Sequence, residues 1–527
     1  MSKKSLSTKI YDSWTAVTGG LLSLGMPAVA AKYRYGRNMY RTYVAGEISG
    51  PDQNYRPRTR SGDADVRRGY KWVTSRVRDQ VQNNGQIRGG IRRICNNVVR
   101  RGIFPLFTFR DHSGKLDKKK NKQWATMFRR WAKYADYSGH DSYGALQSLM
   151  LKHMWMDGQF LIHRVYDYSL PGVVPLRLEL IECDQLDARV DGVLASGNIA
   201  RRGKEFDKTT GRPVRYHILR NHPGDDISHA RHQESIVYDA KDIIHVYERD
   251  RISQSSGISW LAAVVMEAYR MADYREIHQN TARWQSGIVA FLESQFPGFN
   301  LGGGLPIGGQ TSQYSPAATG ATEAPSEVEL NKIQAIPPGT KVDFKTPTHP
   351  ASNYEPFMRD SNRSQSTGIG MSYEAYTNDY TSSTWASARS GTLEERLGYE
   401  NQQYFLGEKT GDQIAAWFIE AAWLAGLAPT MPKYVQDPLV HHESVSHQFP
   451  GWQWVDLRNA AMASKIFLDL DLDTRTNILS QRGELFDDVI ETLIEEEEEL
   501  TKLAVARLER ARINKEIEEI NKDASAK

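Results

Sequence analysis

The residues with the clearest chemical potential form an acidic cluster before the middle of the chain. Glu182, Asp184 and Asp187 fall within six positions, directly after an apolar run at 176–181. Carboxylates this close could hold two divalent cations and activate water for cleavage of a phosphodiester. A nuclease of that kind would need further carboxylates on adjoining strands and a catalytic lysine, and the sequence yields no such set. Turn or cap residues are therefore the better interpretation of the cluster.

Other patterns typical of catalysis are missing from the sequence. His441 and His442 are the one adjacent histidine pair, and no cysteine or further histidine stands at metal spacing beside them. The glycine-rich stretch 302–309 has no Gly-Lys-Ser/Thr and no strand-to-helix frame for a phosphate loop. We therefore predict no catalytic residues, no cofactor and no metal, and a protein that is not an enzyme.

A polar stretch at 368–389 has a different character. It begins with Gly-Ile-Gly and continues through Ser, Thr, Tyr and Asn, and its charges are Glu374, Asp379 and Arg389. It contains neither lysine nor histidine. Long polar loops between ordered elements are usually functional or disordered. On these residues alone, a functional loop and a surface loop with a Ser/Thr helix cap are equally good interpretations.

Composition limits the class of protein. A chain of 527 residues is too long for one hydrophobic core, so we expect two to four domains. Two cysteines, Cys95 and Cys183, cannot form a disulfide framework and indicate a reducing compartment. No apolar run reaches the roughly 18 residues of a transmembrane helix, so no membrane is expected as a partner.

Charge is distributed unevenly along the chain. Residues 1–130 hold 28 Lys and Arg against 8 Asp and Glu, whereas residues 484–527 hold 14 acidic against 7 basic residues. Nucleic acid is the obvious partner for the basic end. A solvated basic face, or one that complements a neighbouring subunit, explains the same charges equally well.

The first half of the chain predicts an α+β domain. Two helices over 69–101 are separated at Asn83-Asn84-Gly85, a basic loop covers 111–122, and two further helices follow around 124–131 and 146–155. Short runs typical of β-strands come next, and turn residues separate them, which favours a mostly antiparallel sheet. These runs are 160–165, 176–181, 214–219 and 242–247.

The second half is predicted to be mainly helical. A helix should begin at Ser259 and continue to about 286, followed by a strand at 288–292 and a flexible insertion at 295–330. A strand at 342–345 and a helix at 354–367 lead into the polar stretch. Beyond it, a helical region covers 384–424, in which four glycines should weaken or kink the helix. Helix dominates again from 460 onward.

The order of several motifs resembles the portal proteins of tailed bacteriophages, specifically the lambda-type portal family. The resemblance covers about 70–495. Its segments are Val81-Gln-Asn-Asn-Gly85 with Asn96 to Ile103, Leu178 to Asp187, Gly211 to Ile218, Asp242 to Tyr247, Gln254 to Leu261, and Gly368 to Glu374 through Ser387-Ala-Arg389. The Tyr-Ser-Ser-x-Arg pattern of the family is here Trp385-Ala-Ser-Ala-Arg389, and the first 60 and last 30 residues have no clear match.

The resemblance implies an α+β portal fold with wing, stem, clip and helical crown, assembled as a ring of twelve copies around a central channel. Closed cyclic symmetry suits contacts between unlike surfaces of neighbouring copies. The implied parts are an N-terminal arm (1–59), a first part of the wing (60–255), a stem helix (256–286), the clip (287–352), a second stem helix (353–369), the tunnel loop (370–383), a second part of the wing (384–454) and the crown (455–527).

The resemblance also implies where double-stranded DNA would pass. A sliding duplex needs weak, replaceable contacts, because each neutralised phosphate adds salt-dependent affinity. A loop of hydroxyl and amide side chains meets that need. The expected tunnel-loop residues are Ser372, Tyr373, Tyr376, Thr377, Asn378, Asp379 and Tyr380, and the expected channel face of the stem consists of Glu267, Arg270, Arg275, Arg359 and Arg363.

Further partners follow from the same resemblance. They are the terminase large subunit, head-completion or adaptor proteins, and the major capsid protein with its scaffold. The expected location is the portal vertex of the virion, after assembly in the host cytoplasm. Two other functions stay open at this point: a metal-dependent DNA-processing enzyme that uses the carboxylates of 182–187, and a basic scaffold protein that binds nucleic acid.

Overall fold

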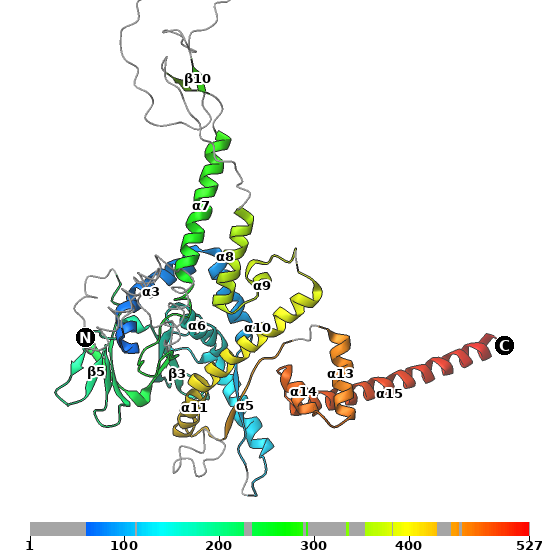
Figure 1. Cartoon of the computed structure of the whole chain (residues 1–527). Coiled ribbons are helices and arrows are strands. Elements are labelled where there is room, and N and C mark those ends of the chain that lie inside the picture. The colour runs from blue at the N-terminus through cyan, green and yellow to red at the C-terminus, as the bar shows by residue number, and fades with distance from the viewer. Residues whose placement is uncertain are drawn as a thin grey trace, which may run out of the picture. The chain divides into compact units, whose positions relative to one another are not determined.

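The computed structural model describes residues 59–110, 113–225, 234–287, 291–293, 334–336, 354–381, 383–428, 444–452 and 456–525 (Figure 1). Helices and antiparallel sheets occur in separate stretches of the chain, so the predicted α+β class is confirmed. All of the predicted arm (1–59) except its last residue, most of the predicted clip and the predicted strand at 342–345 lie outside the described residues. Within the described ranges, no helix has the length and apolarity needed to span a bilayer.

Two helices open the body where the sequence predicts them. They are α3 (Gly62–Asn83) and α4 (Gly85–Val98), and Asn84 between them caps α4 by accepting from the backbone N–H groups of Gln86 and Ile87. The predicted break is therefore confirmed, and its cause is an N-cap. The apolar residues at helical spacing in both helices point into the core, which is why the periodicity was informative.

The next two helices are α5 (Lys118–Trp131) and α6 (Tyr143–Met156). The side chain of Asp117 accepts from the backbone N–H of Lys120, so Asp117 is the N-cap and α5 begins at Lys118. The lysines of 118–122 therefore belong to the first turns of a helix, and the prediction of a basic loop that extends to 122 is wrong. An N-cap aspartate outweighs the mutual repulsion of exposed lysines, because their charges remain in water.

Two antiparallel sheets follow where one was predicted. In the first, β2 (Gln159–Tyr166) lies between β3 (Leu176–Ile181) and β9 (Ile243–Tyr247). The second contains, in order, β4 (Gly192–Val193), β5 (Ile199–Arg201), β6 (Lys204–Phe206), β7 (Pro213–Leu219) and β8 (Ser235–Asp239). A separate pair joins β1 (Phe104–Phe107) to β12 (Val445–Gln448), a strand that the sequence pattern did not predict.

An aromatic cluster holds the largest core together. The ring of Phe128 lies 4.8 Å from that of Trp131, 5.4 Å from Tyr143 and 4.9 Å from Phe418, measured between centroids. Tilted and edge-on aromatic pairs at such distances add to the free energy of burial. Because Phe418 belongs to α11 (Asp412–Leu424), the cluster joins distant parts of the chain into one core.

The segment that follows β9 is anchored by its backbone. Gly158, in the turn between α6 and β2, has φ +76°, and a Cβ there would overlap the carbonyl carbon of Ile258. The Oγ of Ser259 donates to the carbonyl oxygen of Trp155 at 2.7 Å. Residues 255–259 are therefore irregular and 260–264 form turns, and α7 (Val265–Gly287) begins six residues after the predicted start at Ser259. Tertiary anchoring overrides a helical pattern here.

A buried lysine fixes the same segment to the second sheet. Lys204 of β6 is 1% exposed, and its Nζ donates to the carbonyl oxygen of Ser255 and to the Oγ of Ser256. Burial lowers the pKa of Lys204 to about 8, because a charged ammonium is poorly solvated there. The segment that leads into α7 thus depends on a titratable group.

We expect the stability of the protein to depend on pH through Lys204. Between pH 8 and 10.5 the folded chain has released this proton while the unfolded chain still holds it, so unfolding free energy rises with pH. The full effect is roughly 3 kcal/mol. In Lys204→Met this gain is absent, so the melting temperature of the wild type should rise relative to that of the variant between pH 7.5 and 10. Lys208→Met, at an exposed lysine, is the control; parallel pH curves for wild type and Lys204→Met would contradict the prediction.

The two helices predicted to form the stem are neighbours in the structure. α7 and α8 (Tyr354–Ile369) pack side by side (Figure 1). Tyr274 of α7 stacks on Tyr354 at 5.9 Å and meets Phe357 edge-on at 5.1 Å. The predicted helix at 354–367 is therefore confirmed. Two short strands beyond α7, β10 (Phe291–Glu293) and β11 (Gln334–Ile336), pair in parallel.

The predicted helical region 384–424 contains a change of helix type. α10 (Trp385–Leu406) continues into a π-helical segment (Gly407–Gly411) and then α11. A Cβ at Gly411 would clash with the imidazole ring of His447, and one at Gly407 would crowd both His447 and Phe449. Two of the four glycines thus mark the irregularity, as predicted, whereas Gly391 and Gly398 lie within regular helix.

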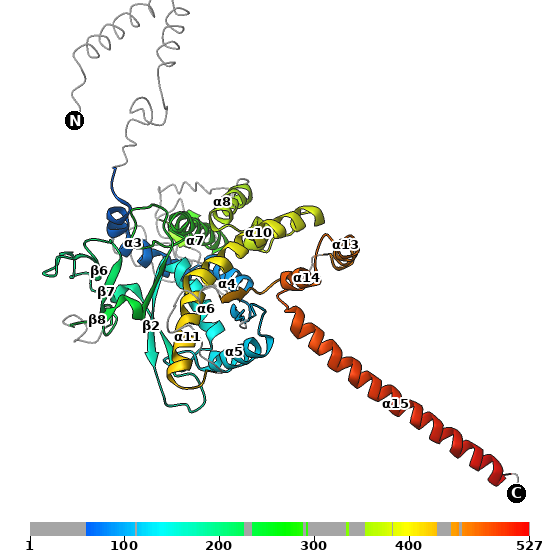
Figure 2. The same ribbon diagram turned by 90° about the horizontal axis from the view of Figure 1, so that it is seen from below.

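Helices also dominate the C-terminal part, as predicted. They are α13 (Leu457–Asp469), α14 (Arg475–Gln481) and α15 (Phe486–Ser525), and Figure 2 shows them from a second direction. α15 approaches α5 through exposed ion pairs, among them Lys122 with Glu491 at 2.6 Å. Pairs as exposed as this one contribute little free energy.

Candidate functional site

The polar stretch between α8 and α10 starts with a glycine-dependent helix end. Gly370 has φ +74°, the N–H of Met371 donates to the carbonyl oxygen of Ser366, and that of Gly370 to Thr367. This is the Schellman arrangement, in which a left-handed residue ends the helix and satisfies its last carbonyls. The chain therefore leaves α8 in a fixed direction.

The next residues form a short helix, where a loop was expected. α9 (Tyr373–Thr377) is capped by Ser372, whose Oγ accepts from the backbone N–H of Ala375. The backbone N–H of Ser372 donates to Glu395 of α10 at 2.6 Å. α9 ends at Asn378, which is left-handed with φ +58°. The described residues of this stretch thus form a hook between α8 and α10, which we call the α9 hook (residues 370–381, 383 and 384).

Tyr376 anchors the hook in the core. Its side chain is 5% exposed, its hydroxyl donates to the Oε1 of Gln365 at 2.9 Å, and its ring lies against Gly90 of α4. Burial raises the pKa of Tyr376 to about 12. Although the sequence placed Tyr376 among the residues facing DNA, its side chain is directed into the protein. A Cβ at Gly90 would lie at ordinary van der Waals distance from this ring, so the two helices pack closely here.

Asp379 organises the turn that follows α9. Its carboxylate accepts from the backbone N–H and the hydroxyl of Thr381, and from the hydroxyl of Tyr373 at 3.1 Å. These hydrogen bonds, those of Thr381 first, lower the pKa of Asp379 below its ordinary value. The carboxylate is therefore ionised at neutral pH and holds its own loop in shape.

Arginines approach the hook from both sides. The guanidinium of Arg363 lies 5.6 Å from the ring centroid of Tyr373, and Arg93 of α4 donates to the Oδ1 of Asn378 at 2.5 Å. The sequence drew attention to the lack of lysine within the stretch and missed Arg93, which is 285 positions away. An arginine on a helix carries no sequence signal that it meets a distant loop.

The remaining predicted loop residues differ in exposure. Thr377 turns back, and its hydroxyl donates to the carbonyl oxygen of Tyr373. Tyr380 is 56% exposed, and Asn378 and Thr381 are also exposed. The outer surface of the hook thus consists of hydroxyl and amide groups around the ionised Asp379.

The five predicted stem residues lie in different settings. Glu267 accepts from the hydroxyl of Ser364, so it faces α8, and Arg275 donates to Gln86 of α4 at 3.0 Å. Arg270 and Arg363 are exposed, and the partly buried Arg359 pairs with Glu355 one turn away. The structure brings Arg363 to the hook and directs Glu267 and Arg275 toward neighbouring helices.

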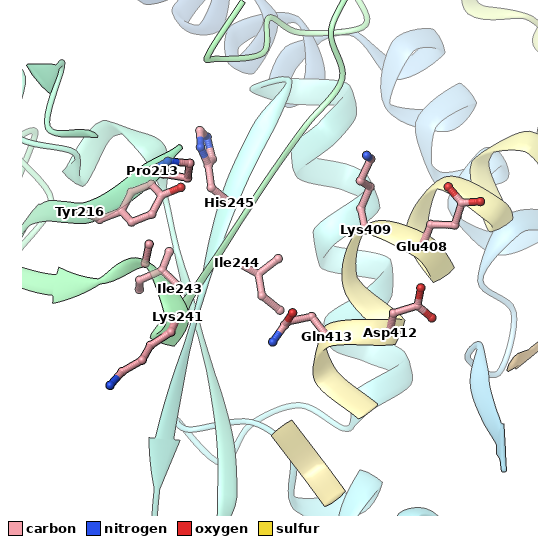
Figure 3. A pocket seen from close by; sticks show the side chains of 11 residues that line it. Pro213, Tyr216, Lys241, Ile243, Ile244, His245, Glu408, Lys409, Asp412 and Gln413 are labelled. Atoms are coloured by element: carbon pink, nitrogen blue, oxygen red, sulfur yellow. The ribbon is translucent and has the colours of Figure 1, made fainter. Parts of the chain in front are cut away.

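A pocket of about 380 Å³ lies between the sheets and the π-helical segment (Figure 3). His245, on its strand side, bonds Gln159 at 3.1 Å, and burial lowers its pKa well below the ordinary value. On the helix side, the carboxylate of Asp412 is engaged by His447 at 2.7 Å. His245 is therefore uncharged at neutral pH and Asp412 already has a partner, which does not favour acid–base catalysis by these two residues.

The carboxylates of the possible metal site are occupied by an arginine. Ligand atoms of Glu182, Asp184 and His222 lie within 4.8 Å of one another. Arg78 donates to Asp184 at 2.6 Å, to Glu182 at 3.1 Å and to the buried Asp157 at 2.8 Å. A guanidinium bound to both carboxylates neutralises the charge that would attract a cation.

Asp187 is the third carboxylate of the nuclease site that the sequence left open, and it has a different partner from Glu182 and Asp184. Arg189 holds it through two hydrogen bonds of 2.8 Å, and these lower the pKa of Asp187. The three carboxylates of 182–187 therefore do not converge, and a two-metal centre built from them has no support in the described residues. The ion pairs of Arg78 with Glu182 and Asp184 join α3 to the segment directly after β3.

Comparison with known proteins gives the chain its family. The family model described as "Phage portal protein, lambda family" matches residues 49–403. A probable portal protein of Halomonas phage phiHAP-1 is 23% identical over 470 residues, which is 88% of each chain.

Solved structures with partial likeness come from gene transfer agent particles. A chain in the neck of the empty particle has a TM-score of 0.39 and 11% identity, and the match covers 81% of this chain and 94% of that one. A chain in the neck of the native particle has a TM-score of 0.38 and 11% identity, with coverage of 78% and 93%. The family match extends over about two thirds of the sequence, from before α3 into α10. The chain therefore belongs to the lambda family of phage portal proteins.

Proposed function

We propose that this portal protein forms a closed ring at one vertex of the capsid and conducts double-stranded DNA during packaging and ejection. The family consists of structural proteins of the virion. Membership in it therefore favours a structural role over an enzymatic one. The α9 hook is the observation that favours passage of DNA. Its exposed groups are neutral or anionic, so they would make only weak contacts with a duplex that must slide. Its shape is fixed by Tyr376 and Asp379.

In this proposal the hook is the part of each copy nearest to the duplex. Ser372, Tyr373, Thr377, Asn378, Asp379 and Tyr380 form or support its surface, whereas Tyr376 acts only as an anchor. α7 and α8 form the stem, and the segments between them form the clip. The proposed partners of that end are the terminase large subunit and later the head-completion proteins, while the capsid protein and scaffold meet the wing and crown during nucleation of the procapsid.

Negative-stain electron microscopy of the purified chain tests the proposal. We expect rings with a central hole wide enough for a duplex. The mass of the ring should correspond to twelve copies of the chain. A protein that stays monomeric at every concentration and salt, and that binds duplex DNA tightly as a monomer, would instead be the scaffold-type protein. Plasmid cleavage that needs a divalent metal and is lost in Asp184→Ala would support the enzyme.

A further inference from the structure

One helix of the body presents an isolated aromatic residue to solvent. Trp72 of α3 is 67% exposed, while Val77 and Val81 on the opposite side of the same helix are buried. Arg68 and Arg76 stand one turn before and one turn after Trp72, so all three lie on one stripe. We call Arg68, Lys71, Trp72 and Arg76 the α3 face.

A second helix exposes an apolar stripe with glutamates beside it. On α10, Leu393, Leu397 and Tyr404 are 47%, 56% and 55% exposed, and their spacing places them on one side of the helix. The other side carries the buried Tyr399, Gln403 and Leu406. Glu394 and Glu400 flank the stripe. Leu393, Leu397, Tyr404, Glu394 and Glu400 form what we call the α10 face.

The two helices that carry these faces pack on the same core. α4 packs against both α3 and α10, and both views show these helices on different sides of α7 (Figures 1 and 2). Closed rings need this arrangement, because each copy must present two different surfaces to its two neighbours.

The chemistry of the faces is complementary. Among the described residues, Arg68 and Lys71 have no ion-pair partner, and neither does Glu394. Tryptophan and arginine are the residue types that most often dominate the energy of protein interfaces, and leucines supply the apolar surface that an indole ring packs against. Two α3 faces would repel one another through their cations, which disfavours a symmetric contact through this surface.

We propose that the α3 face of one copy packs against the α10 face of the next copy, with Trp72 between Leu393 and Leu397 and the cations of α3 beside Glu394 and Glu400. The inference rests on the proposed ring and adds which surfaces close it. The hook leads directly into the N-terminal end of α10, so this contact also fixes the hooks of neighbouring copies relative to one another.

Cross-linking of engineered cysteines tests the contact directly. Both native cysteines are buried, so a thiol-specific bis-maleimide reacts mainly at introduced sites. In Arg68→Cys/Glu400→Cys we expect a ladder of dimers, trimers and higher species on denaturing gels. Each single variant should remain monomeric on the same gel, because a contact between unlike faces leaves every introduced cysteine opposite a residue without a thiol.

Alanine substitution provides the second measurement. Trp72→Ala should require roughly tenfold more protein to form rings, as judged by native mass spectrometry, with an unchanged melting temperature of the monomer. Tyr168→Ala is the matched control, since Tyr168 is 66% exposed and lies outside both faces; its assembly should equal that of the wild type.

The outcomes separate the contact from the function. Dimers from Arg68→Cys alone, or rings that form normally while the double variant yields no ladder, would overturn the proposed contact and leave the portal function standing. Failure of the wild type to form rings at all would overturn the proposed function itself.

Discussion

Replacement of Asp379 by lysine is expected to slow DNA translocation at least roughly tenfold while ring assembly remains intact. The substitution changes the hook of every copy from anionic to cationic, so a ring would surround the duplex with a collar of ammonium groups. Each phosphate that such a group neutralises adds affinity that must be broken at every step. A packaging reaction with procapsids, terminase and ATP measures the translocation rate.

Two controls separate charge from loop shape. Asp379→Asn retains an oxygen that can accept from Thr381 and Tyr373, and removes only the charge, so its rate should lie much nearer to that of the wild type. Higher salt should restore part of the Asp379→Lys rate, because salt weakens contacts to phosphate. Unchanged packaging by Asp379→Lys at low salt would show that the hook does not approach DNA.

Substitution of Gly158 by alanine should prevent recovery of folded protein. A Cβ at this position overlaps the backbone of Ile258, and neither backbone can move without displacing Ser259 from Trp155 and Lys204 from Ser255. Backbone overlap cannot be relieved by a change of rotamer. The expected loss exceeds roughly 4 kcal/mol, which a marginally stable protein does not tolerate.

Gly114→Ala provides a matched control for backbone strain. Gly114 has φ +80°, close to the +76° of Gly158, but a Cβ there meets nothing within 4 Å. The control should lose only roughly 1–2 kcal/mol, the penalty for a left-handed alanine. Soluble yield and thermal unfolding measure both variants. A Gly158→Ala protein as stable as the control would mean that the close approach of 158 and 258 is not needed for the fold.

The elements that the sequence predicted well are those with local causes. Asn84 separates α3 from α4 as an N-cap, and Gly407 with Gly411 marks the irregularity between α10 and α11. The short apolar runs of β2, β3 and β9, bounded by turn residues, needed no distant partner to be recognised. Local hydrogen bonding, backbone freedom and periodicity are visible in a few consecutive residues.

The features that were missed depend on contacts between distant residues. β12 is four residues long and pairs with β1, more than 300 positions earlier, so nothing local identifies it. The late start of α7 follows from anchors at Gly158 and Lys204 rather than from its own sequence. At the hook, the types of the residues predicted a polar surface, but only the fold shows that Tyr376 is an anchor and that Arg93 meets Asn378.

The π-helical segment makes this part of the chain sensitive to length as well as to sequence. A π-turn contains one residue more than an α-turn, so the insertion or deletion of a single residue at 407–411 would turn α11 by about 100° about its axis relative to α10. Phe418 would then leave the aromatic cluster, and the polar side of α11 would enter it. Gene variants with single-codon deletions at 407–411 should therefore be selected against more strongly than most substitutions at the same positions.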